Sequence, residues 1–164
     1  MKRALFIAAF AMLLLSATAL QAQQTTMSVK VDGLSNHCPN GTFDVLSFSF
    51  GASNSPKGTP SAKTASVSDF SVMKVFDSCS PDLFQATVSA TNLATATLTM
   101  KRKDNGNTVL TVQLIGVFVS SDQFSGSSEL PTESVSFSAN KVVITDTASG
   151  ATVCWDNVLR KTCS

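Results

Sequence analysis

Hydrophobic and polar residues alternate along most of the chain from Met27 onward. The alternation is clearest in Met27–Val31, Leu46–Phe50 and Ala96–Met100, where every second residue is apolar. A period of two predicts β-strands with one buried and one solvated face. Further strands are expected at 67–76, 109–120, 134–140 with its continuation 142–144, and around Val153 and Trp155.

Three interruptions of this alternation carry recognisable turn or helix signals. The sequence Asp-Asn-Gly-Asn at 104–107 predicts a hairpin, because Asn and Gly tolerate a positive φ. Ser80-Pro81-Asp82 offers an N-cap hydroxyl, a proline at the first helical position and an acidic first turn, which predicts a short helix over about 81–90. At Gly116 the apolar parity of 109–120 switches, which predicts a bulge or a corner.

The remaining segments are rich in Ser, Pro, Gly and Asn and are expected to be loops, at 33–42, 52–63 and 124–131. The loop at 52–63 is expected to be mobile. About seven strands and one helix at these intervals predict a mainly β fold, a compact antiparallel β-barrel of two sheets. The single short α-helix (about 81–90) would flank the barrel and cover one open end.

The first residues have the three-part pattern of a secretory signal peptide. Lys2 and Arg3 precede an unbroken apolar run at 4–15, and small residues follow up to Ala22. Cleavage is expected after Ala22, with Ala19 as the other candidate. The run is short for a hydrocarbon core about 30 Å thick, so cleavage is favoured over a membrane anchor. We therefore expect a signal peptide at 1–22 and one β-barrel domain at 23–164, exported to the periplasm or secreted.

The charge of the chain argues against polyanionic partners. Only 14% of the residues are charged, and removing Lys2 and Arg3 lowers the formal net charge from +1 to −1. A near-neutral protein has no electrostatic reason to bind nucleic acid or an anionic membrane. The only basic cluster, 101–103, runs into a turn and is interpreted as a solvated strand end.

All four cysteines, Cys38, Cys79, Cys154 and Cys163, lie in the expected mature domain. An even number in an exported chain favours disulfides, because the compartment outside the inner membrane is oxidising. Four cysteines allow three connectivities, and the sequence alone does not choose among them. A short C-terminal loop closed by Cys154 and Cys163 is weakly favoured, which leaves Cys38 for Cys79.

Candidate catalytic and metal-ligating residues are few. His37 is the only histidine and lacks partners at ligand spacing, so it is interpreted as a loop residue beside a disulfide. Asp44 and Asp69 could be the paired acids of a glycosidase, but strand ends or turns explain them better. Trp155 and the phenylalanines are interpreted as barrel core rather than a sugar-stacking platform. No Gly-x-Ser-x-Gly elbow, dinucleotide fingerprint or phosphate loop is present, so we expect no enzyme, cofactor or metal.

An ordered set of motifs resembles the haemolysin-coregulated protein (Hcp) family, the tube proteins of type VI secretion systems. The motifs are Phe43–Gly51, Val67–Lys74, Asp77 with Ser80–Leu83, Val117–Ser121, Pro131–Phe137 and Trp155–Asp156. They cover nearly all of residues 27–160 in the family's order. No single motif is diagnostic, and the specificity lies in the ordered set.

The resemblance implies a structural protein that forms a homo-hexameric ring. Stacked rings would make a tube that carries or chaperones effector proteins, with the loop at 33–42 contacting a neighbouring subunit. A cyclic, heterologous interface closes a ring, and stacking identical rings gives a filament. Hydroxyl-rich strand faces would give a hydrophilic lumen that does not grip its cargo.

This chain departs from the family pattern in its export signal and its cysteines. Both departures point to a relative adapted to the periplasm or the exterior. An alternative function is an exported monomeric β-barrel binding module that kept the fold without tube assembly and uses the loops at 52–63 and 124–131 for a ligand. A third, a small secreted hydrolase, rests only on the abundance of Ser and Asp.

The export signal makes the first testable prediction. A fusion of roughly the first thirty residues to a reporter enzyme that is active only after export should give an active, processed reporter. The same reporter without this segment is the control. Reporter protein that accumulates unprocessed in the cytoplasm would show that the segment is not a signal peptide.

Overall fold

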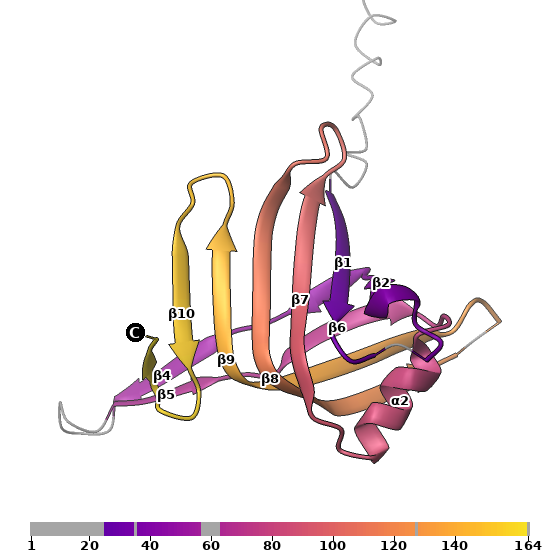
Figure 1. Ribbon diagram of the computed structural model, residues 1–164, viewed down its shortest axis with the longest axis horizontal. Coiled ribbons are helices and arrows are strands. Elements are labelled where there is room, and N and C mark those ends of the chain that lie inside the picture. Colours follow the sequence, from indigo (N-terminus) through magenta and orange to yellow (C-terminus); the bar gives the residue numbers. More distant parts are fainter. Residues whose placement is uncertain (1–24, 35, 57–62, 127, 164) are drawn as a thin grey trace, which may run out of the picture.

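The computed structural model describes residues 25–34, 36–56, 63–126 and 128–163 (Figure 1). The predicted signal peptide lies outside these residues. The elements are β1 (Thr25–Val31), the 3-10 helix η1 (Pro39–Gly41), β2 (Thr42–Asp44), β3 (Ser47–Ser49), β4 (Ala52–Pro56), β5 (Lys63–Val67), β6 (Phe70–Val75), α2 (Ser80–Val88), β7 (Leu93–Arg102), β8 (Thr108–Ser125), β9 (Thr132–Asp146), β10 (Thr152–Asp156) and β11 (Lys161–Thr162). The prediction of a mainly β, antiparallel fold with one short α-helix is confirmed.

Two long strands, β8 and β9, pair with each other and belong to two sheets at once. The first half of β8 pairs with β7, and the second half of β9 pairs with β10. The first half of β9 instead pairs with β6. Figure 1 shows both strands bending sharply between an upright sheet, which contains β1, β7 and β10, and a flatter one, which contains β6.

The segment 42–49 joins the two sheets on the other side. Its β2 part pairs with β1 of the upright sheet, and its β3 part pairs with β6 of the flatter sheet. Between them, the Val45 N–H donates to Met27 O and the Leu46 N–H donates to Met73 O. With 42–49 taken as one kinked strand, the pairing runs in a circuit through β1, β7, β8, β9 and β6, as expected for a barrel.

Aliphatic and aromatic side chains from both sheets fill the space between them. The core consists of Val29, Val31, Leu34, Cys38, Phe43, Val45, Phe70, Val72, Cys79, Leu83, Ala86, Leu93, Ala96, Leu98, Val112, Leu114, Val117, Val119, Val135, Phe137 and Val142. Most are Val, Leu or Phe on one parity of their strand, so the alternation read from the sequence is the physical basis of the barrel. The helix contributes Leu83 and Ala86 and packs against β8.

The corner predicted at Gly116 is confirmed. The buried side chains of β8 are Val112 and Leu114 before it, and Val117 and Val119 after it. The register with β9 does not shift there, so the change of parity is a bend and not an inserted residue. The register shift lies a little later, between Val119 and Ser121.

Several element boundaries differ from those expected. The prediction of a mobile loop at 52–63 was wrong for 52–56, because β4 pairs with β5 in a separate two-stranded sheet. Backbone hydrogen bonds build this hairpin, so its Ser-rich composition gave no strand signal. Residues 57–62 lie outside the described part. The loop expected at 124–131 begins later, because β8 continues to Ser125.

The helix and the segment before β3 also differ in detail. The helix spans Ser80–Val88, and the position before it is Cys79, without a side-chain cap, because the Ser80 hydroxyl bonds elsewhere. Leu46, expected on the inner face, is exposed where the chain kinks between β2 and β3. Among the described residues, no helix is long and apolar enough to cross a membrane.

A substitution at Gly116 tests how the corner is formed. Its φ is +63°, and a Cβ added there would lie 2.6 Å from Asn140 Nδ2. Gly116→Ala should lower the free energy of unfolding by about 1–3 kcal/mol, measured by urea unfolding. The control is Gly106→Ala, where φ is +71° but nothing lies within 4 Å of the added Cβ. Equal losses in both variants would mean that the corner does not depend on close approach to Asn140.

Candidate functional site

The start of α2 is held by a buried lysine on the neighbouring strand β6. The Lys74 side chain is fully buried, and its Nζ donates to Asp77 Oδ1 (2.9 Å), Ser80 Oγ (2.9 Å) and Glu133 Oε2 (2.8 Å). Ser80 in turn donates to Glu133 Oε2 and accepts from the Asp77 N–H. An ammonium has three donor protons, so each one has an acceptor. The cluster ties β6, β9 and the first residue of α2 together.

The loop at 33–42 is attached to the same end of the helix. A disulfide joins Cys38 to Cys79, so this pairing of the cysteines is confirmed. Asp82 Oδ2 accepts from the backbone N–H groups of His37 (2.7 Å) and Cys38 (3.1 Å). The loop expected to reach toward a neighbouring subunit therefore packs on its own helix, and a contact with a neighbour stays a prediction.

His37 forms a pair with Asp82 at this anchor. The His37 Nδ1 lies 2.8 Å from Asp82 Oδ1, while the rest of the ring is exposed. Burial of Asp82 raises its pKa, but the hydrogen bonds from His37 and Cys38 outweigh it and hold the pKa below the ordinary aspartate value. Within the described residues, no group of three or more His, Cys, Asp or Glu side chains is placed to hold a metal ion. His37 thus anchors a loop beside a disulfide, as its sequence position indicated.

The helix end of the molecule exposes an aromatic cluster. Phe124, at the end of β8, contacts Phe76 (ring centroids 5.5 Å apart) and Phe84 of α2 (5.8 Å). All three rings are more than two-fifths exposed, and Leu130 in the following loop is 78% exposed. We call these four residues the aromatic end. The prediction that the phenylalanines are barrel core was wrong for these three and for Phe118 of β8, which is also exposed. Phe76 and Phe124 lie at or beyond strand ends, and Phe84 lies on the exposed side of α2.

A second group of exposed apolar residues lies at the opposite end, near the C-terminus. It consists of Val153 on β10 with Val158 and Leu159 in the turn before β11. We call it the C-terminal end. Figure 1 shows α2 at one end of the long axis and β10, β4 and β5 at the other. The second disulfide, Cys154–Cys163, joins β10 to the residue after β11 and confirms the other predicted pairing.

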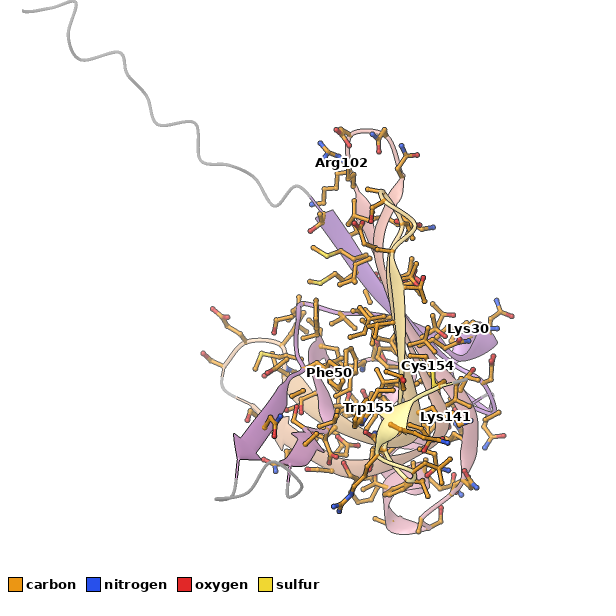
Figure 2. All side chains as sticks on the ribbon, turned by 90° about the vertical axis from the view of Figure 1, so that its left-hand side faces the viewer. Lys30, Phe50, Arg102, Lys141, Cys154 and Trp155 are labelled. Carbon is orange, nitrogen blue, oxygen red and sulfur yellow. A yellow bond between two sulfur atoms is a disulfide. The ribbon has the colours of Figure 1, made fainter. Side chains whose placement is uncertain are left out.

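Trp155 lines a cleft at the C-terminal end rather than filling the core. The cleft has a volume of about 340 Å³ and is walled mainly by Phe50, Ala52, Val67, Val142, Ile144 and Trp155. In Figure 2, which faces this end, Phe50 and Trp155 lie near each other in the middle of the view, with Cys154 beside the tryptophan. The interpretation of Trp155 as barrel core was therefore wrong, since its ring is only half-buried.

The outward faces of the strands are lined with hydroxyl groups. On the flatter sheet Ser71 and Ser136 hydrogen-bond each other (2.8 Å), and on the upright sheet Thr95, Thr97 and Thr99 follow one another on β7. These hydroxyl groups are polar but uncharged, so they stay hydrated without adding charge to the faces.

The remaining candidate residues occupy strand ends, as their sequence context indicated. Asp44 ends β2, and Asp69 lies between β5 and β6, where it accepts a hydrogen bond from Ser120 Oγ (2.6 Å). Arg102 and its neighbours 101 and 103 are exposed at the β7–β8 hairpin, at the top of Figure 2, and Arg102 pairs with Asp104.

Comparison with known proteins agrees with this geometry. A model of the protein family described as "Type VI secretion system effector, Hcp" matches residues 29–145. Among curated proteins, no relative matches the chain.

Solved structures share the fold at low sequence identity. Hcp1 from Salmonella typhimurium is 22% identical with a TM-score of 0.72, over 86% of this chain and 100% of that chain. Hcp2 from the same species is 22% identical with a TM-score of 0.64, over 83% and 98%. Hcp1 from Flavobacterium johnsoniae is 13% identical with a TM-score of 0.59, over 80% and 99%.

The class of protein follows from the fold: a compact two-sheet β-barrel flanked by one helix, with apolar residues exposed at two ends. The family match spans well over half of the chain, and the solved Hcp structures align along nearly their whole length. The chain belongs to the Hcp family.

The two disulfides make a prediction about stability. Cys38 and Cys79 are 41 residues apart and buried, whereas Cys154 and Cys163 are 9 apart. Replacing the first pair by alanine should cost about 4 kcal/mol of unfolding free energy, and replacing the second about 3 kcal/mol, in the chain-entropy model. Urea unfolding of both variants under oxidising conditions measures this, and each pair serves as the control for the other. A larger loss for the C-terminal pair would contradict the dependence of stability on loop length.

Proposed function

We propose that the mature chain is a structural subunit that closes into a ring of six copies, whose rings stack into a tube that carries or chaperones effector proteins. The observation that carries the proposal is membership of the Hcp family over residues 29–145, together with a fold that covers Hcp structures almost end to end. This role requires no catalytic residue, cofactor or metal.

The two apolar ends support a ring. A ring that closes by rotation needs a heterologous contact, in which two different surfaces of the subunit meet. The aromatic end and the C-terminal end are different in composition and lie at opposite ends of the long axis (Figure 1). Contact between them would cover side chains such as Leu130 and Leu159, which are 78% and 61% exposed in the single chain.

The hydroxyl-lined faces support passage of cargo. Serine and threonine hydroxyls stay hydrated and carry no charge, so a lumen lined with them has little affinity for a folded protein of either sign. The near-neutral charge of the mature chain fits the same role.

The cysteine pairs support export. Both pairs are joined as disulfides, which persist in oxidising compartments outside the cytosol. We propose that residues 1–22 are a cleaved signal peptide and that the ring assembles in the periplasm or outside the cell.

The cleft beside Trp155 favours a second candidate function, an exported monomeric binding module. Its largely apolar walls and its volume of about 340 Å³ are in the range of small-molecule pockets. The family membership favours the ring, because the whole described barrel corresponds to self-assembling relatives and the cleft is only one feature of it.

Paired variants test the ring and its geometry. Light scattering and negative-stain electron microscopy of the mature chain should show rings. Leu130→Asp and Leu159→Asp should each give monomers in place of rings, because each variant places a charge in an apolar contact. Mixing the two variants should give a dimer and nothing larger, because only one intact contact can form between them.

The control is Met73→Ser, which changes an exposed residue on the serine-rich face of β6 and should leave the rings intact. Wild-type chain that stays monomeric at high concentration would rule out the ring and leave the binding module. Rings formed by both aspartate variants would place the contact elsewhere.

A further inference from the structure

Two acidic side chains face each other inside the aromatic end. Asp122 on β8 and Glu133 on β9 come from paired strands, with Asp122 opposite Val135 and Phe124 opposite Glu133. Glu133 is 1% exposed. Both oxygens of Asp122 and the Oε1 atom of Glu133 are shielded from solvent and have no hydrogen-bond donor in the described structure.

The charged groups around the pair leave one acid uncompensated. The Lys74 ammonium on β6 is directed to Glu133 Oε2 and to Asp77, and the Ser80 hydroxyl of α2 also donates to Glu133 Oε2. These contacts use the lysine donors and one side of the Glu133 carboxylate. None of these groups donates a hydrogen bond to Asp122, so two ionised carboxylates here would repel each other.

A proton resolves both problems. A protonated Asp122 is neutral and can donate to the free Glu133 Oε1, which gives a donor to the buried oxygen that lacks one. We propose that Asp122 and Glu133 form a proton-binding pair that fastens the end of β8 to β9 beneath α2 and releases this end when the proton is lost.

The electrostatic balance agrees with the geometry. Burial of Asp122, followed by the charge of Glu133 and the hydrogen bond to it, raises the pKa of Asp122 to about 7, and Lys74 opposes the shift. An unfolded chain has an ordinary aspartate pKa of about 3.9. The folded chain therefore keeps a proton that the unfolded chain has released. The stability from this proton is full at acidic pH, declines as pH rises toward 7, and is lost above it.

The position of the pair gives the proton a structural effect. Phe124 follows Asp122 by two residues and packs on Phe76 and Phe84, so movement of this strand end moves the aromatic cluster. A consequence for assembly, stronger ring contact at acidic than at alkaline pH, rests on the proposed function. The proton-binding pair itself does not.

The test compares the wild type with Asp122→Asn, which is neutral at every pH and can still donate to Glu133. Between about pH 5 and 7 the wild-type unfolding constant should rise up to about tenfold per pH unit and then level off. Asp122→Asn should lack this slope and should keep strong amide-exchange protection at 118–125 above neutral pH. The control is Asp104→Asn in the exposed hairpin, which should keep the wild-type slope.

Carbon-13 NMR of the aspartate carboxyl groups gives a second readout that does not depend on stability. One carboxyl signal, absent in Asp122→Asn, should titrate with a midpoint near 7. Titration of Asp122 in the ordinary range, or an unchanged slope in Asp122→Asn, would overturn the proposal. So would recovery of acid-level stability at alkaline pH on adding calcium or magnesium, which would make the pair a cation site. Because every readout reports within one chain, absence of rings would leave these results unaffected.

Discussion

A buried ammonium group is the constraint on which the rest of this structure depends. A charge removed from water is tolerated only when it is paired and hydrogen-bonded, and the loss of one partner typically costs about 3–5 kcal/mol. Lys74 meets this requirement with acceptors from a turn, from α2 and from β9. Satisfying one side chain therefore fixes the start of the helix against β6 and β9 of the flatter sheet. The residues that follow, Cys79 and Asp82, then fix the loop at 33–42 to the helix.

Much of the barrel could be predicted from the sequence because its signals are local. Alternation with a period of two marks a strand, Asp-Asn-Gly-Asn marks a hairpin, and the change of parity at Gly116 marks a corner, whatever lies elsewhere in the chain. The corner decides the architecture, since it lets β8 and β9 serve two sheets. The hairpin β4–β5 was missed because most of its residues are Ser, Thr, Asn or Pro, a composition typical of loops.

The candidate site depends on contacts that span long stretches of sequence. Lys74 meets Glu133 across 59 residues, and His37 meets Asp82 across 45. One signal was available: Lys74 shares its strand parity with Phe70 and Val72, which indicated an inward side chain. A lysine at such a position is more often solvated, so burial becomes certain only once its acceptors are placed. The exposure of Phe76 and Phe124 likewise depends on where strands end, which parity does not determine.

The two disulfides are placed where assembly would need rigidity. Cys38–Cys79 lies at the start of α2, behind the aromatic end, and Cys154–Cys163 encloses the turn that carries Val158 and Leu159. The barrel has an apolar core of its own, to which the two cross-links add stability. A surface fixed before contact loses less conformational entropy on binding. If the two ends meet in a ring, as proposed, the cross-links would lower the entropy lost in that contact in addition to stabilising the fold.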